Sequence, residues 1–270
     1  MANSYNGTLK GNASTSLPVS MARQDSILDL FSTNYFALSS KSHSSASSLS
    51  TGRPIASRSV RTASALIFPP DQRVPVAQPS YPFSAVGQMI SRWKGTDGML
   101  NTGDDIVLSS SGAMVSKFHF LTAGHSVYQK KFGGWAAQVE VQLPGGRTAF
   151  KTSLRSYSGW TRNQDFRYDL GLVTLDRNIG NQTSWFGYGY NNAIRSGTLF
   201  YSTGYPSDKA DANGDGIRDN FNVWTQVGTI TQTTDLTLRS TDLDLATGAS
   251  GGPLWLQTKS GPIIYGVTSN

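Results

Sequence analysis

Apolar residues in this chain fall mostly into short runs of strand length, separated by turns rich in glycine and proline. In Gln138–Leu143 apolar and polar residues alternate strictly before Pro144 and two glycines, which predicts a half-buried strand followed by a turn. Residues 170–175 form a short apolar run, which is typical of a core strand. Further strands are predicted at residues 81–90, at 113–121 as a pair, and at 198–203, 222–230, 253–256 and 262–267.

Strands at this spacing, with little helical periodicity between them, predict an all-β barrel or sandwich. A length of 270 residues allows one or two domains. Residues 1–64 differ from the rest, since eight of the twelve positions at 39–50 are serine. Such a stretch buries too little apolar surface to offset its chain entropy, which predicts disorder. A propeptide ending near residues 61–65 is a compatible interpretation.

The net charge of +6 arises mainly in residues 1–64, where six Lys and Arg residues oppose two Asp residues and leave +4. The remainder carries about +2 without a basic stripe, which argues against nucleic-acid binding. No apolar window is long enough to span a membrane, and no signal-peptide pattern is visible. We therefore expect no nucleic-acid or membrane partner, and a monomer.

The chain contains no cysteine, so disulfides, a thiol nucleophile and a Cys-ligated zinc site are excluded. Its three histidines do not have the spacing of a catalytic zinc site, and no catalytic cofactor is expected.

Three short motifs carry candidate chemistry, with His125 after Leu-Thr-Ala-Gly, Asp169 before an apolar strand, and Ser250 in Gly-Ala-Ser-Gly-Gly-Pro. A serine hydroxyl becomes a nucleophile when a base takes its proton and a buried acceptor fixes the tautomer of that base. His125, Asp169 and Ser250 fit these roles. Asp165 is a less favoured orienting carboxylate, and His119 is expected to be structural.

Glycines around Ser250 allow a sharp backbone turn, in which the amides of Gly248 and Ser250 would converge on one point. Two such donors would form an oxyanion hole. The competing interpretation is an ordinary Gly-Ser turn. Together, the motifs predict a serine endopeptidase acting on protein or peptide substrates through an acyl-enzyme. A non-catalytic binding protein that keeps the fold is the alternative function.

These motifs resemble the chymotrypsin-like serine endopeptidases, and more closely the bacterial glutamyl-endopeptidase branch. The matching stretches are 66–73, 121–128, 158–160, 168–175, 185–188, 204–206 and 248–253. The resemblance implies two antiparallel six-stranded β-barrels, at about 65–180 and 181–270, with the active site between them. His125 and Asp169 would lie in the first barrel and Ser250 in the second. It also implies secretion, and a propeptide removed close to Ala65.

Departures from the family pattern concern activation and the substrate pocket. Ala249 replaces an aspartate that pairs with the new amino terminus in trypsin-type enzymes. Thr268 stands where glutamyl enzymes have a glutamate-binding histidine. Asp244 aligns with the acidic pocket base of trypsin-like enzymes, which would favour Lys or Arg before the scissile bond, although a solvated turn residue is also compatible. Asp244, Thr268 and Ser269 are the predicted pocket residues. The chain stops inside the pocket wall, so the second barrel is expected to be incomplete and the natural polypeptide longer.

A candidate ion site lies between Tyr205 and Asn222. Oxygen ligands at Asp211, Asn213, Asp215 and Asp219, with the carbonyl of Ile217, have the spacing of a calcium-binding loop. A plain turn is the competing interpretation. Asp97, Asn101, Asp104 and Asp105 form a second acidic loop with a weaker pattern. Calcium is thus the candidate structural ion.

Overall fold

The structure is a computed structural model that describes residues 36–38, 66–77, 79–190, 194–209, 222–234 and 236–269. Within these ranges the chain is mostly antiparallel strands with a few short helices, which confirms the all-β prediction. The candidate calcium loop at 211–219 lies outside the described residues, as does most of the serine-rich segment. Across the described part of the chain, no helix is long and apolar enough to cross a membrane.

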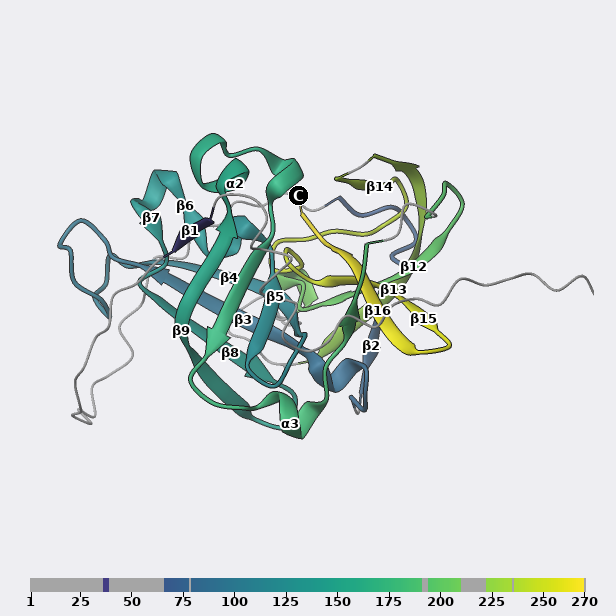
Figure 1. The fold of residues 1–270 in the computed structure, drawn as a ribbon, viewed down its shortest axis with the longest axis horizontal. Coiled ribbons are helices and arrows are strands. Elements are labelled where there is room, and N and C mark those ends of the chain that lie inside the picture. Colours follow the sequence, from purple (N-terminus) through teal and green to yellow (C-terminus); the bar gives the residue numbers. More distant parts are fainter. Residues whose placement is uncertain are drawn as a thin grey trace, which may run out of the picture.

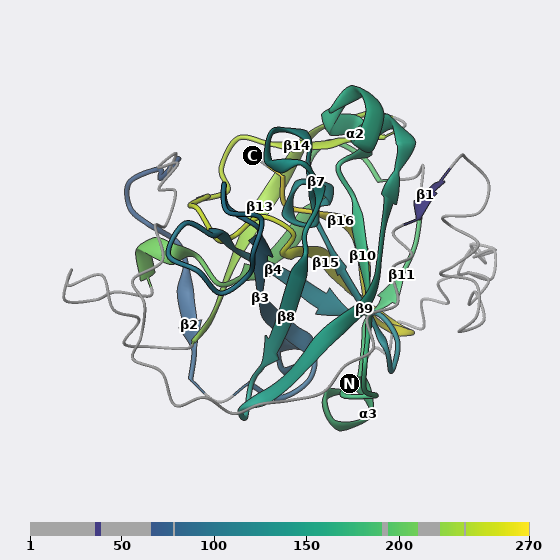
Figure 2. The ribbon, with the colours of Figure 1, turned by 90° about the vertical axis from the view of Figure 1, so that its left-hand side faces the viewer.

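Six strands close the first barrel (Figures 1 and 2). They are β3 (Val86–Trp93), β4 (Ile106–Met114), β5 (His119–Thr122), β8 (Gln138–Leu143), β9 (Arg147–Tyr157) and β10 (Gly171–Leu175). They pair in the order β3-β4-β5-β10-β9-β8, and β8 pairs back onto β3. All six pairings are antiparallel. The first predicted barrel is therefore confirmed.

The barrel interior is filled by the apolar residues of the predicted pattern. Val139, Val141 and Leu143 of β8 are at most 1% exposed, while the residues between them are half-buried. Gly87 and Gly112 face each other across β3 and β4, and a Cβ on either would collide with the Phe120 ring. Small residues at these two positions let a large aromatic side chain occupy the interior.

The second half of the chain forms an open sheet on the right of Figure 1. Its strands are β11 (Gly187–Tyr188), β16 (Gly261–Val267), β15 (Pro253–Thr258), β12 (Leu199–Gly204), β13 (Val223–Thr233) and β14 (Leu238–Ser240), in that order. β2 (Val74–Val76) also pairs with β13. Among the described strands no pairing joins β11 to β14, so this sheet does not close. The β11–β16 pairing is parallel, a departure from the predicted antiparallel barrel.

Short elements decorate the two sheets. They are α2 (Ser158–Asn163), α3 (Gly180–Thr183), the β6 (Tyr128–Gln129) and β7 (Gly134–Trp135) ribbon, and 3₁₀ turns at Phe83–Ala85, Gly124–Ser126, Lys130–Phe132, Phe166–Tyr168 and Ser207–Lys209. β1 (Phe36–Leu38) pairs with the outer edge of β9. The rest of residues 1–64 lies outside the described residues, so the expected disorder of that segment stays a prediction.

One apolar cluster joins the two halves. Trp255 of β15 is 3% exposed and packs edge-on against Phe186 and Phe83, with centroid distances of 5.7 and 6.0 Å. A smaller cluster fills the second sheet and includes Phe200, Ile230 and others. The main core therefore includes residues of both sheets, which pack directly on one another. The candidate site lies between these two halves.

Candidate active site

His125 is positioned by the end of β5 and the 3₁₀ turn that follows it. Gly124 must be small, because a Cβ there would lie 2.9 Å from both Asp169 Oδ1 and a ring carbon of Trp160. The imidazole packs edge-on against Trp160, with centroids 6.2 Å apart. The His125 carbonyl accepts a 2.8 Å bond from the Gln129 side chain. The ring is thus fixed, while 17% of the side chain stays exposed.

Asp169 binds His125 at two points. Its Oδ2 lies 2.7 Å from ring Nδ1, and its Oδ1 accepts the backbone N–H of His125 at 2.6 Å. The Ser269 hydroxyl donates to Oδ2 at 2.5 Å. Burial alone would raise the pKa of Asp169, but the hydrogen bonds and charge of His125, with the Ser269 hydroxyl, outweigh it and hold the pKa below its ordinary value. The buried carboxylate is therefore ionised at neutral pH.

The other candidate side chains have local partners. Asp165 accepts the N–H of Arg167 at 3.0 Å and pairs with its guanidinium at 2.6 Å. His119 lies 2.7 Å from the Ser116 hydroxyl through Nδ1, and burial together with the charge of Arg155 lowers its pKa. The structure therefore brings Asp169, and not Asp165, to His125.

Ser250 lies at the tip of a tight turn between β14 and β15 and is 8% exposed. Gly248 and Gly251 have φ values of +91° and +83°, a backbone region that glycine occupies without strain. Bonds of 3.0 Å from the Ala249 N–H to Ala246 and from the Gly252 N–H to Ala249 close the turn. The sequence around Ser250 thus forms the sharp turn that its glycines predicted.

Ser111 of β4 ties this turn to the first barrel. Its N–H donates to the Ser250 carbonyl at 2.8 Å, and its hydroxyl donates to the Gly248 carbonyl at 2.7 Å. Gly251 abuts the end of β5, since a Cβ on it would lie 2.2 Å from Thr122 Oγ1 and 2.7 Å from the Ala123 amide nitrogen. The turn around Ser250 therefore packs against the residues that lead directly into His125.

Two backbone bonds set the direction of the predicted oxyanion donors. The N–H and C=O of one trans peptide unit point in opposite directions. The Thr247 carbonyl accepts from the Ser207 N–H at 2.7 Å, so the Gly248 N–H points away from Ser207. The Ala249 carbonyl is held by Gly252, which fixes the Ser250 N–H in the same way. Ser207 is thus a direct support of the turn.

The predicted pocket residues Thr268 and Ser269 lie between Ser250 and Asp169. The Gly251 N–H donates to the Thr268 carbonyl at 2.7 Å, and the Thr268 N–H donates to Gly252 at 2.8 Å. Thr268 is 4% exposed, and its hydroxyl oxygen has no hydrogen-bond partner among the described residues. The side chain of Ser269, which was predicted in the pocket, donates its hydroxyl hydrogen bond to Asp169.

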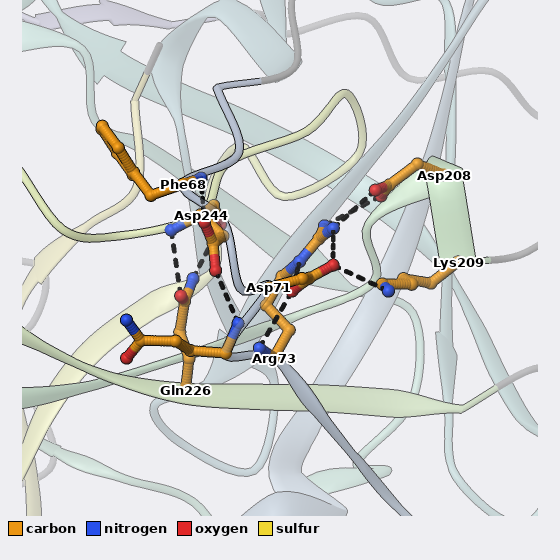
Figure 3. Close-up of polar contacts among 8 residues, drawn as sticks. Phe68, Asp71, Arg73, Asp208, Lys209, Gln226 and Asp244 are labelled. Atoms are coloured by element: carbon orange, nitrogen blue, oxygen red, sulfur yellow. Dashed lines mark hydrogen bonds and ion pairs between the residues drawn. The ribbon is translucent and has the colours of Figure 1, made fainter.

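Asp244 has a different environment from the one predicted. It is 1% exposed, and its carboxylate accepts the backbone N–H of Phe68 at 2.7 Å and that of Gln72 at 2.9 Å (Figure 3). Gln226 holds its backbone from the other side, with bonds of 2.7 and 2.9 Å. Both carboxylate oxygens are therefore bound to a segment that precedes the first barrel. A role as the base of a pocket for Lys or Arg gains no support from this geometry.

The acidic loop before β4 uses most of its carboxylate oxygens internally, although the buried Asp105 Oδ1 has no hydrogen-bond partner among the described residues. Asp104 accepts from the Thr96 and Thr102 hydroxyls at 2.7 and 2.9 Å, and these bonds lower its pKa to about 2. Asp105 accepts the Asn101 N–H at 2.7 Å. No three His, Cys, Asp or Glu side chains gather as a metal site within the described ranges. The calcium residues Asp211–Asp219 are outside those ranges, so that site stays a prediction.

Sequence reasoning missed the residues that support the triad candidates. Ser111 and Ser207 hold the turn of Ser250, and Trp160 packs on His125. Trp160 also donates its indole N–H to the Tyr128 carbonyl at 3.0 Å, which fixes the ring. Trp160 belongs to the Ser-Gly-Trp stretch at 158–160 that carried part of the resemblance. Ser111 and Ser207 stand in a strand and a turn whose sequences have no distinguishing pattern.

The closed barrel, the second sheet and the site between them define a chymotrypsin-like protein. A family model described as Trypsin matches residues 86–270. The chain therefore belongs to the trypsin family, and the resemblance to the chymotrypsin-like serine proteases near the glutamyl-endopeptidase branch is confirmed.

Two curated bacterial proteins are similar in sequence. The glutamyl endopeptidase of Bacillus licheniformis is 30% identical over 173 residues, which cover 60% of this chain and 51% of the relative. The extracellular metalloprotease of Bacillus subtilis is 30% identical over 138 residues, which cover 48% of this chain and 41% of the relative. The chain thus matches about half the length of these relatives.

Two solved structures share the fold. A Glu endopeptidase in complex with MPD superposes with a TM-score of 0.60 at 22% identity, covering 75% of this chain and 86% of the other. The protease Anisep from Arthrobacter nicotinovorans superposes with a TM-score of 0.53 at 19% identity, covering 72% of this chain and 86% of the other.

Proposed function

We propose that this chain is a serine endopeptidase in which Ser250 is the nucleophile, His125 the general acid and base, and Asp169 the orienting carboxylate. The observation that carries the proposal is the contact of Asp169 with both the ring Nδ1 and the backbone N–H of His125. A buried carboxylate on Nδ1 keeps the proton there, so that Nε2 is free to accept a proton from a serine hydroxyl.

In the proposed reaction, Ser250 Oγ attacks the substrate carbonyl carbon as His125 Nε2 takes its proton. The amides of Gly248 and Ser250 donate to the oxygen on which negative charge develops, and Asp169 stabilises the imidazolium. His125 then gives the proton to the leaving amine as the peptide bond breaks, which leaves an acyl-enzyme. Water, deprotonated by His125, then attacks the acyl carbon, the bond from that carbon to Ser250 Oγ breaks, and His125 returns the proton to Oγ as the carboxylic acid product leaves. Each amide donor is expected to contribute about 10²–10³ in kcat.

Digestion of a peptide library tests this proposal. We expect the wild-type chain to cleave internal peptide bonds and the Ser250→Ala variant to leave the same library intact. A binding protein that keeps the fold would leave the library intact in both forms, which would overturn the proposal.

The same digest reports the residue before the scissile bond. Because both Asp244 oxygens are already bound to backbone amides, we propose that Asp244 does not select Lys or Arg. The sequence similarity to a glutamyl endopeptidase supports acidic residues as the first substrates to test. Thr268 replaces the expected histidine, so we expect weaker discrimination between acidic and neutral residues. Dominant cleavage after Lys or Arg would return Asp244 to the pocket.

We also propose that the protein acts outside the cell and that a propeptide ending near residues 61–65 is removed. A curated relative named as an extracellular metalloprotease supports the location. The composition of residues 39–50 and the backbone pairing of Leu66 with Leu245, where the described domain begins, support the boundary. Amino-terminal sequencing of the protein recovered from culture medium tests both, and a start well away from residue 66 would contradict the boundary.

A further inference from the structure

The segment 66–73, which we call the strap, runs past Asp244 and the Ser207–Lys209 turn (Figure 3). Two backbone bonds of 2.7 and 2.9 Å pair Leu66 with Leu245, and the strap amides of Phe68 and Gln72 bind the Asp244 carboxylate. The strap therefore holds residues 244–245, which directly precede the turn that begins at Ala246.

The other end of the strap holds the second support of the turn. The Arg73 side chain, 4% exposed, donates two hydrogen bonds of 2.9 and 2.6 Å to the Asp208 carboxylate. Asp71 pairs with Arg73 at 2.8 Å and with Lys209 at 2.8 Å. The hydrogen bond from Arg73 is the largest cause that holds the pKa of Asp71 well below its ordinary value. The 3₁₀ turn Ser207–Lys209 is thus bound to the strap by an ionic network around the buried Arg73 guanidinium.

This 3₁₀ turn contacts the predicted oxyanion hole. Ser207, next to Asp208, donates its N–H to the Thr247 carbonyl, which belongs to the same peptide unit as the Gly248 N–H. Gly248 packs so closely on this turn that a Cβ would lie 2.6 Å from both Ser207 Oγ and the Tyr205 carbonyl. A continuous set of contacts therefore leads from Arg73 through residues 207–208 to Gly248.

Arg73 of the strap and Ala249 of the turn around Ser250 line the same small cavity. The residues that line it include Arg73, Gly204, Pro206, Gln226, Asp244 and Ala249. Ala249 occupies the position immediately before the nucleophile and has no charge to pair with an amino terminus. Asp244 and Arg73 lie nearby, and their partners are internal residues of the strap and the Ser207–Lys209 turn.

We propose that Asp244 and Arg73 are positioning residues that dock the strap and thereby set the orientation of the Gly248 and Ser250 amides, so that Asp244 acts on the rate of the chemical step and not on substrate selection. This inference rests on the proposed endopeptidase function. The Asp244 carboxylate binds backbone amides within the strap, so docking of the strap needs no free amino group at residue 66.

The test compares Asp244→Asn with Asp242→Asn as a matched control. Asp242 lies two residues away and also accepts a backbone N–H, that of Thr229 at 2.9 Å, but it does not bind the strap. We would measure kcat and KM on a peptide that the wild type cleaves, and the rate at which a fluorophosphonate labels Ser250. For Asp244→Asn we expect kcat and the labelling rate to fall at least about tenfold with KM little changed, because misplaced oxyanion donors weaken transition-state binding. For Asp242→Asn we expect wild-type values.

Asp208→Asn gives a second variant whose side chain is 35% exposed and whose folding is more secure. It should lower kcat in the same direction, and it decides the question alone where Asp244→Asn does not fold. Wild-type kcat in a folded Asp244→Asn or Asp208→Asn variant would overturn the proposal. A loss confined to substrates with Lys or Arg before the scissile bond would also overturn it and make Asp244 a pocket residue. A wild-type chain that neither cleaves nor takes the label would instead refute the proposed function.

Discussion

Asp169 holds His125 at two points, the ring through Nδ1 at 2.7 Å and the backbone N–H at 2.6 Å. The second bond fixes the position of the residue and the first fixes the orientation and tautomer of its ring. A single carboxylate therefore determines where Nε2 points. It can do so because Gly124 leaves room for its Oδ1 beside the backbone.

Asp169→Asn should remain folded and lose about 10⁴ in kcat, the effect of the same change in the chymotrypsin triad, which is the standard reference case. An amide presents an N–H where Nδ1 needs an acceptor, so the ring is held in the wrong tautomer. Peptide hydrolysis and circular dichroism check the two parts of this prediction. Asp165→Asn is the control, and activity lost there but kept in Asp169→Asn would exchange the assignments.

Ser269→Ala removes the hydroxyl that donates to Asp169 Oδ2. The folded-state pKa of Asp169 lies below its unfolded value, so its bonds stabilise the fold above about pH 4 and lose this effect as pH falls through the folded pKa. We expect Ser269→Ala to unfold at a lower temperature at pH 7, and the difference from wild type to shrink below about pH 4. Thermal unfolding from pH 7 to pH 3 measures this. The exposed Ser260→Ala serves as control, and a difference independent of pH would contradict the prediction.

Gly251→Ala should abolish most activity and destabilise the fold by more than about 1 kcal/mol. Its φ of +83° strains any side chain, and the new Cβ would collide with Thr122 and with the backbone of Ala123. Gly197→Ala is a matched control, since its φ of +89° is similar and a Cβ there meets nothing within 4 Å. Denaturant unfolding of both variants separates strain from collision. Equal destabilisation would show that the contact with Thr122 is unimportant.

Calcium binding at Asp211, Asn213, Asp215, Ile217 and Asp219 remains a prediction from spacing. Titration calorimetry with calcium should give heat for the wild type and much less for Asp211→Ala and Asp215→Ala. Asp104→Ala, in the other acidic loop, should bind as the wild type does. Unchanged binding in the first two variants would remove the site.

The alternation of apolar and polar residues predicted strands where one face of the strand lines the core. The strict alternation at Gln138–Leu143 coincides with β8, because one face of that strand lines the barrel. The segment predicted as a strand at 81–90 begins instead with a 3₁₀ turn at Phe83–Ala85, where its aromatic residue packs against Trp255. Tertiary packing decided the structure there, which no periodicity shows.

Contacts between distant residues explain most of what the sequence could not predict. Asp244 binds amides more than 170 positions away, and Ser269 binds Asp169 at a separation of 100. The family resemblance favoured a pocket role for Asp244, with a solvated turn residue as the alternative. Residue type alone does not reveal which neighbours the fold supplies to a carboxylate. Short motifs with small residues mark His125, Asp169 and Ser250 in the sequence, and their roles as a triad stay a prediction.

The central claim is that Ser250 is a nucleophile activated by His125. Labelling with a fluorophosphonate, followed by mass spectrometry of the modified peptide, tests it most directly. We predict one label on Ser250 in the wild type, none at that position in Ser250→Ala, and labelling slowed by orders of magnitude in His125→Ala and Asp169→Asn. A folded wild-type chain that takes no label at Ser250, or takes it equally fast without His125, would contradict the account.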